Sequence, residues 1–230
     1  MVNLREWALP IYTIMMQMAA GSMLILWLTF TWILWRYGSV TASKVSKNPV
    51  IIIFITVITA MFGSHYHLSR PAFSIFAVLN FQSSWLSREV GFTAFFALLV
   101  GILLGLMHYR VHAVKVHLLV GWGAAIMGSM TVYAMAQVYL LPTQIAWNSI
   151  ATPIAFFCAM ILLGAIAVSV ILLMDLYLSL LVTHANIHHI PHIIQQLLSL
   201  TSWMAVFFAS IELDQYGFHL FDLLARCHTA

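Results

Sequence analysis

Residues Gly63 to Gly91 read GSHYHLSRPAFSIFAVLNFQSSWLSREVG and connect two long apolar runs of the chain. His65 and His67 close the first run, and Glu89 lies at the start of the second. If both runs cross a membrane as helices, these polar groups meet at one membrane interface. In so apolar a chain, this connection is the first place to look for chemistry.

The composition predicts an integral membrane protein. Of 230 residues, 63% are hydrophobic and 7% are charged, with a mean hydropathy of +1.00, whereas soluble domains carry about a quarter charged residues. Several segments reach the roughly 20 apolar residues that cross a bilayer. They must be helices, because lipid cannot satisfy backbone amides and the segments lack the alternation of barrel strands. We therefore predict an all-α, polytopic transmembrane helical bundle.

The bundle is expected to be a single domain over residues 1–230 with six spans, at about 9–35, 49–66, 90–107, 115–140, 151–182 and 193–211. No small-residue cleavage site follows the first run, so we expect it to be retained as a span. Pro10 suits the first turn of that helix, and Asn48-Pro49 suits the start of the second. Gly21-Ser22 permits close contact between helices.

Lysine and arginine in the short loops predict the orientation. The first loop contains Arg36, Lys44 and Lys47, the third contains Arg110 and Lys115, and neither contains an acidic residue. These loops are expected to face the cytoplasm, which places both termini and the Gly63–Gly91 connection on the opposite side. No run of basic residues indicates a nucleic-acid partner.

The positions of the histidines limit the possible cofactors. All eleven lie at the ends of the predicted spans or in loops. A b-type haem held between helices needs two axial histidines at matched depth on facing helices, and the sequence offers no such pair. We predict no haem, so any electrons must pass through a diffusible carrier or a cofactor in a partner.

A quinol site at the outer interface is one hypothesis. Oxidation of a quinol releases two protons and two electrons, so the pocket needs hydrogen-bonding groups and a base that titrates near neutral pH, a role that suits histidine. His67, Arg70 and Glu89 could supply the acceptor, an orienting charge and the proton exit. Further polar candidates are His65, Gln17, Gln137 and Tyr139. The competing interpretation is a solvated polar cluster at a membrane end, which the pattern alone favours.

Histidines on the predicted cytoplasmic side suggest a second hypothesis. They occur in HYRVH and HANIHHIPH and at one position between these motifs, as His108, His112, His117, His184, His188, His189 and His192. Such spacing resembles the boxes of membrane di-iron desaturases and hydroxylases. However, the boxes are few and irregular and carboxylate support is scarce. A solvated histidine-rich loop is the favoured interpretation, and we predict no metal in this chain.

Three blocks carry a family resemblance. They read REWALPIYTIMMQMAAGS (residues 5–22), HYHLSRPAFSIFAVLNFQSSWLSREV (65–90) and QVYLLPTQIAWNSIATPIAFFCAMILLGA (137–165). In order, they resemble the membrane anchor subunits of the dimethyl sulfoxide reductase family (the DmsC family) and, more distantly, the polysulfide reductase anchors. The most specific element comprises His67-Leu68, Pro71, Leu79-Asn80, Leu86-Ser87 and Glu89.

The resemblance implies a haem-free anchor of eight helices in the bacterial inner membrane, within an anaerobic respiratory reductase. It would oxidise menaquinol near the periplasmic face and pass electrons to an iron–sulfur subunit, which feeds a molybdopterin catalytic subunit. Carried over, His67 is the quinol-site histidine and Glu89 its acidic partner. The chain departs from the family in having Arg70 where a small or polar residue is usual, and in reaching six predicted spans.

Overall fold

The computed structural model describes residues 4–67, 80–110, 112–143, 147–182 and 194–211 of the chain. The labelled helices are α1 (Leu4–Tyr37), α2 (Ser39–His67), α3 (Trp85–Tyr109), α4 (Val114–Tyr139) and α5 (Ala151–Val182). A further helix, Ile194–Ile211, follows. Six helices are long and apolar enough to cross a membrane, and the described residues contain no strand. The predicted all-α fold with six spans is confirmed.

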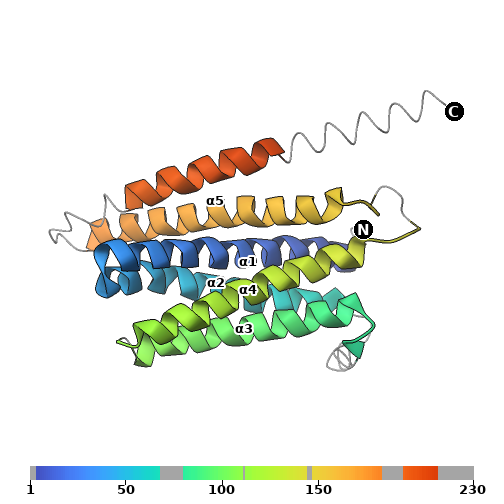
Figure 1. Cartoon of the computed structure of the whole chain (residues 1–230), viewed down its shortest axis with the longest axis horizontal. Helices are drawn as coiled ribbons and strands as arrows, with labels where there is room; N and C mark the ends of the chain where they lie inside the picture. Colours follow the sequence, from blue (N-terminus) through green and yellow to red (C-terminus); the bar gives the residue numbers. More distant parts are fainter. Residues whose placement is uncertain (1–3, 68–79, 111, 144–146, 183–193, 212–230) are drawn as a thin grey trace.

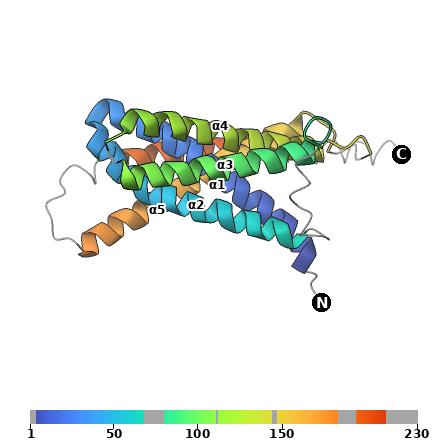
Figure 2. The same ribbon diagram turned by 90° about the horizontal axis from the view of Figure 1, so that it is seen from below.

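The helices lie side by side along the long axis of the molecule, as Figure 1 shows. Helix α1 is central, because it packs against α2, α4 and α5. Helices α3 and α4 form a closely packed pair, seen side by side in Figure 2. The fully buried large side chains of α1 are Met16, Met23, Leu26, Trp27, Phe30 and Ile33. The core of the bundle therefore surrounds this first helix.

The helix starts differ from the sequence prediction. Pro10 lies inside α1 rather than in its first turn, and Pro49 lies inside α2, so Asn48 does not begin that helix. Asn48 instead donates a hydrogen bond to Asp175 of α5. The two helices are separated by Gly38 alone, whose φ of 87° is in the left-handed region that glycine adopts readily.

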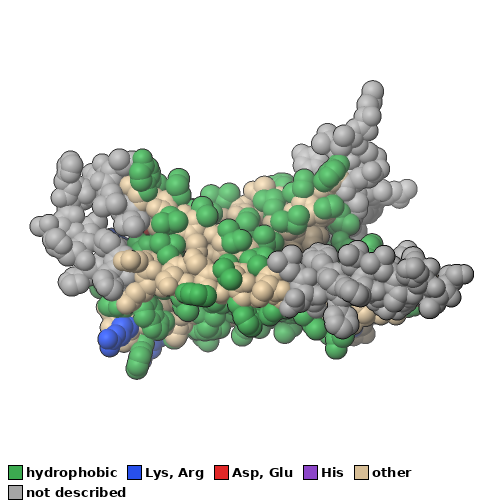
Figure 3. All heavy atoms as spheres, turned by 90° about the horizontal axis from the view of Figure 1, so that it is seen from above, with side chains coloured by type: hydrophobic (Ala, Val, Ile, Leu, Met, Phe, Trp, Pro, Cys, Tyr) green, Lys and Arg blue, Asp and Glu red, His purple; other side chains and the backbone are tan. Residues whose placement is uncertain are grey.

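The basic residues of the first predicted loop therefore lie on helices. Arg36 is in the last turn of α1, and Lys44 and Lys47 are on α2. They still lie at the same end of the bundle as Arg110 and Lys115, which flank the turn between α3 and α4. Figure 3 shows Lys or Arg side chains at one end of the molecule and hydrophobic side chains spread over the middle of that face. This distribution suits a multi-pass membrane protein.

Small residues bring α1 close to two neighbours. A Cβ added to Gly164 of α5 would overlap the backbone of Gly21, and one added to Gly21 would overlap the backbone of Met160. On α4, a Cβ on Gly121 would overlap the indole ring of Trp27. Since helices in lipid associate mainly through such packing, these glycines allow the close helix contacts that hold the bundle together.

Two tryptophans join α1 and α4 by hydrogen bonds. Trp27 donates its indole N–H to the carbonyl oxygen of Leu118 at 3.0 Å, and Trp122 donates to the hydroxyl of Thr31 at 3.2 Å. Trp27 also stacks on Phe30, with ring centroids 4.6 Å apart. These contacts fix α4 against the central helix, and α4 in turn supports α3.

Candidate functional site

The alternating direction of the helices brings several of the sequence-predicted site residues to one end of the bundle. The start of α1, the end of α2, the start of α3 and the end of α4 lie at this end (Figure 1). It is opposite the end that carries Arg36, Lys44, Lys47, Arg110 and Lys115. His67 is the last residue of α2, Glu89 is in the second turn of α3, and Tyr139 is the last residue of α4. We call this the site end.

Glu89 is buried inside the bundle, with 7% of its surface exposed. It lies on the face of α3 that also contains the buried residues Thr93, Phe96 and Val100. Tyr12 of α1, which is also buried, reaches this face, and its hydroxyl lies near the carboxyl group of Glu89. The neighbour of the carboxyl group therefore comes from a helix that is distant from it in the sequence.

Thr93 completes a short series of hydrogen bonds. The hydroxyl oxygens of Tyr12 and Thr93 are 3.2 Å apart. A tyrosine hydroxyl has one hydrogen to donate, whereas an ionised carboxylate only accepts. An ionised Glu89 would therefore favour the arrangement in which Tyr12 turns its hydrogen toward the carboxylate and accepts from Thr93. This leaves other lone pairs of the carboxylate available to a further donor.

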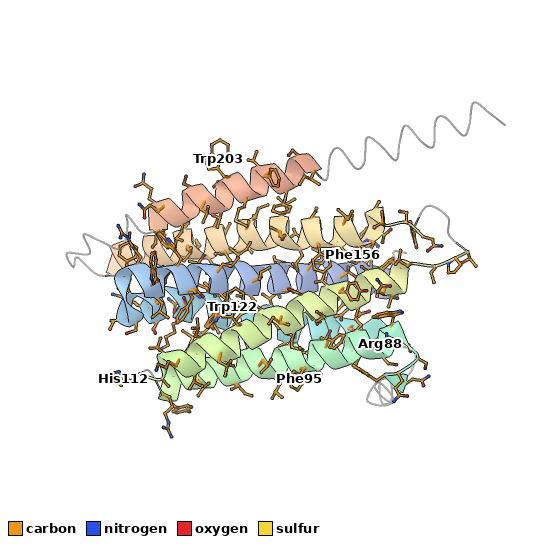
Figure 4. The ribbon with its side chains drawn as sticks, viewed as in Figure 1. Arg88, Phe95, His112, Trp122, Phe156 and Trp203 are labelled. Carbon is orange, nitrogen blue, oxygen red and sulfur yellow. The ribbon has the colours of Figure 1, made fainter. Side chains whose placement is uncertain are left out.

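Arg88 precedes Glu89 but points toward the connection before α3. Consecutive helical residues are about 100° apart around the axis, and Figure 4 shows Arg88 at the site end of α3. Its Nε donates to the carbonyl oxygen of Phe81 at 2.9 Å, and its Nη2 donates to that of Gln82 at 2.5 Å. The guanidinium carbon lies 4.2 Å from the centre of the Trp85 ring.

An aromatic recess surrounds Arg88. The ring of Trp85 meets Tyr133 of α4 edge to face, with centroids 5.7 Å apart. Phe81 meets Phe92 in the same manner at 5.6 Å. The recess has a volume of about 500 Å³ and is lined by Phe81, Gln82, Trp85, Arg88, Phe92, Met130 and Tyr133. It lies on the side of α3 next to the buried face that carries Glu89.

Tyr139 belongs to a separate aromatic group at the same end. Its ring centroid lies 5.8 Å from that of Trp147 and 5.2 Å from that of Phe156 on α5, which Figure 4 labels. Gln137, two residues before Tyr139, is half-buried. Gln17 is buried on α1, five positions after Tyr12 and so deeper in the bundle.

The residue that lies beside Glu89 in the structure is Tyr12, which was not among the residues predicted from the sequence.

Three other predicted site residues are described only in part or not at all. His65 and His67 lie in the last turn of α2, but their side chains are outside the described residues. Arg70 lies entirely outside them. For His67, the structure therefore gives the backbone position at the site end and no contact of the imidazole.

The histidines of the second hypothesis do not share one environment. His108 and His112 are exposed, and Figure 4 shows His112 at the end opposite the site end. His117 is fully buried on α4, and neither of its ring nitrogens has a hydrogen-bond partner in the part of the chain that the structure describes. Within that part, no three His, Cys, Asp or Glu residues form a group that could hold a metal. His184, His188, His189 and His192 lie outside it.

The sequence interpretation did not include Tyr12, Thr93 or Arg88 among the site residues. Tyr12 and Glu89 each lie near the start of their own span, and these two starts lie at the same membrane level when the helices run parallel. Their equal depth in the membrane is the sequence feature from which Tyr12 could have been predicted as a neighbour of Glu89. The contacts of Arg88 could not be predicted in this way, because Arg88 binds backbone carbonyl groups, which every residue type has.

Comparisons with known proteins identify the family. A family model described as "DMSO reductase anchor subunit (DmsC)" matches residues 1–213. The C component of the anaerobic dimethyl sulfoxide reductase of Haemophilus influenzae is 27% identical over 169 residues, which cover 70% of this protein and 57% of that relative. The protein thus aligns with a little over half of that relative's length, and no solved structure matches it significantly. Because the family model covers most of the sequence, this protein belongs to the DMSO reductase anchor subunit (DmsC) family.

Proposed function

We propose that this chain is the menaquinol-oxidising membrane anchor of a molybdopterin-dependent anaerobic respiratory reductase of the dimethyl sulfoxide reductase type. In this proposal, electrons from menaquinol pass to an iron–sulfur subunit and then to the molybdopterin catalytic subunit. Menaquinol is a diffusible substrate, and this chain holds neither haem nor metal. The proposal rests on membership of the family together with one structural feature of the site end.

That feature is the buried carboxyl group of Glu89, which lies in a membrane-spanning helix close to the buried hydroxyl of Tyr12. An ionisable residue inside a membrane span is costly, and its presence there is itself a reason to expect a functional site. In this proposal, Glu89 passes the protons that it accepts to water at the membrane interface beside the site end. A quinol is the lipid-soluble donor whose oxidation requires such proton acceptors.

The roles follow from the chemistry of the reaction. Menaquinol loses two electrons and two protons and becomes menaquinone, so each hydroxyl needs an acceptor. We assign His67 as the base for one hydroxyl and Glu89 as the acceptor near the other. Tyr12 and Thr93 orient Glu89. His65, Arg70, Gln17, Gln137 and Tyr139 remain candidates for contacts with the quinol ring or its isoprenoid tail.

We further propose that the site end faces the periplasm of a bacterial inner membrane. The basic residues of the opposite end support this orientation, since lysine and arginine in short loops favour the cytoplasmic side. The aromatic recess beside Arg88 supports access from lipid, because its lining suits an apolar isoprenoid tail. The family assignment does not favour the di-iron desaturase alternative.

The test compares two electron donors in the assembled complex. His67→Ala should abolish turnover driven by a menaquinol analogue and leave turnover unchanged with an artificial donor that reduces the iron–sulfur subunit directly. General-base assistance is worth about a hundredfold or more. Glu89→Gln should slow the same reaction less, because it keeps a hydrogen-bond acceptor and loses the charge.

His112→Ala is the matched control, since this exposed histidine lies at the opposite end. It should not change either rate. Quinol-driven turnover at the unmutated rate in both His67→Ala and Glu89→Gln would overturn the proposal.

A further inference from the structure

We propose that a groove between α1 and the last described helix, Ile194–Ile211, binds an anionic phospholipid, with an acyl chain in the groove and the phosphate at Arg36. We call it the basic-end groove, because it lies toward the end of the bundle opposite the site end. The site is therefore separate from the proposed quinol chemistry. Lipid surrounds every membrane protein, but here one lipid is held at a fixed place and selected by its charge.

The basic-end groove has a volume of about 430 Å³, within the range of about 300–1,000 Å³ that small-molecule sites occupy. Its floor consists of buried residues from both helices, Ile25 and Thr29 of α1 and Leu197 and Thr201 of the last described helix. The hydroxyl oxygens of Thr201 and Ser169 of α5 are 2.6 Å apart, and this bond holds the last described helix beside α5 (Figure 1). The groove is thus formed by helices that are fixed relative to the bundle.

The rim of the groove opens toward the surface that faces lipid. Leu28 and Leu200, one from each helix, line it and are about half exposed. From Ile25 to Trp32 the groove follows α1 for about 10 Å, at about 1.5 Å per residue. It therefore begins near the basic end and runs part of the way into a hydrocarbon core of about 30 Å. An apolar channel in this direction suits an acyl chain, which enters the membrane from the level of the headgroups.

Thr29 supplies a polar group inside the groove. Its side chain is only 6% exposed, and its hydroxyl forms no hydrogen bond with any residue that the structure describes. The hydroxyls of Thr13 and Thr31, on the same helix, each donate to the carbonyl oxygen four residues earlier. Buried polar groups are almost always hydrogen-bonded. The Thr29 hydroxyl therefore indicates an acceptor within the groove, and the ester carbonyl of a phospholipid, which lies below the phosphate, is such an acceptor.

The face of α1 that lines the groove continues to a positive charge. Thr29, Trp32 and Arg36 follow one another at spacings of three and four residues, so they lie on one face of the helix. Arg36 is exposed in the last turn and forms no ion pair within the described part of the chain. A guanidinium group binds phosphate oxygens through two parallel hydrogen bonds. Basic residues beside a cleft between membrane helices are typical of sites for anionic lipid headgroups.

Two further donors lie at the same end of the groove. The indole N–H of Trp32 has no acceptor among the described residues. Gln196 accepts a hydrogen bond from the hydroxyl of Tyr37 at 3.4 Å, which leaves its amide N–H groups available. Three donor groups above an apolar channel match a phosphate above an acyl chain. A quinol, whose ring is uncharged, would leave Arg36 without a counter-charge.

The experiment measures lipid binding to the assembled complex by native mass spectrometry, after detergent exchange and titration with phosphatidylglycerol in an excess of phosphatidylcholine. Arg36→Gln should raise the apparent Kd of one phosphatidylglycerol about fivefold or more, the effect of one basic residue at a membrane surface. Arg110→Gln is the matched control, because it removes the same charge from an exposed position at the same end, on the turn between α3 and α4. It should leave the Kd unchanged.

A second pair of variants tests the groove itself. Leu200→Trp fills the groove from its rim and should also weaken binding, whereas Leu98→Trp, at a similarly exposed position on α3, should not. Equal affinities of Arg36→Gln and Arg110→Gln for phosphatidylglycerol would overturn the proposal, and so would equal binding of phosphatidylcholine by the unmutated complex. The proposal would also be wrong if the molecule displaced by Leu200→Trp were a quinol.

Discussion

The hydroxyl oxygens of Tyr12 and Thr93 lie 3.2 Å apart, although these residues are 81 positions apart in the chain. This contact connects the first membrane helix with the third, and it holds Tyr12 where its hydroxyl can also bind Glu89. Both residues are buried, so water does not compete for these bonds. A hydroxyl of α1 therefore lies fixed beside the Glu89 carboxyl group of α3.

The first prediction concerns Tyr12. Tyr12→Phe keeps the ring and removes the hydroxyl that contacts Thr93 and that we propose binds the Glu89 carboxylate. A bond to a charged group contributes about 1.5–3 kcal/mol, so we expect quinol-driven turnover to fall about tenfold if that bond orients the acceptor. Turnover with the artificial donor should not change. The two rates are measured on the same preparation of the assembled complex.

Thr93→Val should have a smaller effect of the same kind, because it removes only the bond that orients Tyr12. Thr13→Val is the matched control, since the hydroxyl of Thr13 binds the carbonyl oxygen of Leu9 within its own helix. It should leave quinol-driven turnover unchanged. Equal rates for Tyr12→Phe and the unmutated complex would show that Glu89 does not need this partner.

The sequence predicted the class of fold well, because composition and span length respond directly to the bilayer. It also placed His67 and Glu89 at the same end of the bundle, because one residue ends the second span and the other begins the third. It did not predict that α2 begins at Ser39, because Pro49 indicated a helix start and tertiary packing tolerated the proline inside the helix. Side-chain partners from other helices, such as Tyr12 for Glu89, depend on the rotation of each helix about its axis. Local sequence patterns do not determine that rotation.

The small residues illustrate the same limit. Gly21 was expected to allow a close helix contact, but its partner Gly164 became known only from the packing of α1 against α5. By contrast, the Gly101 and Gly105 pair forms a GxxxG pattern, yet a Cβ on Gly105 would have no neighbour within 4 Å. Spacing alone therefore does not tell which glycines lie at a close contact.

The second prediction compares Gly164, which lies at a close helix contact, with Gly105, which does not. Gly164→Ala should lower the thermal stability of the purified complex by several degrees, because the new Cβ would overlap the backbone of Gly21. Replacing glycine by alanine inside a helix would otherwise stabilise it by up to about 1 kcal/mol. Gly105→Ala, where the space is open, should leave the melting temperature equal or slightly higher. A melting temperature for Gly164→Ala that matches Gly105→Ala would contradict the close contact.

The third prediction concerns haem. The purified complex should show no b-type absorption band that belongs to this chain, because the sequence offers no pair of histidines at matched depth on facing helices. His117 is buried on α4, but a second histidine facing it would be required. A reduced-minus-oxidised spectrum, compared with that of the complex carrying His117→Ala, tests this directly. A b-type band that disappears in the variant would refute the prediction.

The last prediction is the orientation of the chain. Val40, which is 82% exposed, lies at the end with the basic residues, and the exposed Asn80 lies at the site end. Single cysteines at these positions, in a protein whose Cys158 and Cys227 are replaced by alanine, should react with a membrane-impermeant maleimide from opposite sides. In spheroplasts, Asn80→Cys should be labelled at once and Val40→Cys only after permeabilisation, because basic residues favour the cytoplasmic side. Labelling of Val40→Cys alone in intact spheroplasts would place Glu89 toward the cytoplasm, and protons from the quinol would then be released on that side of the membrane.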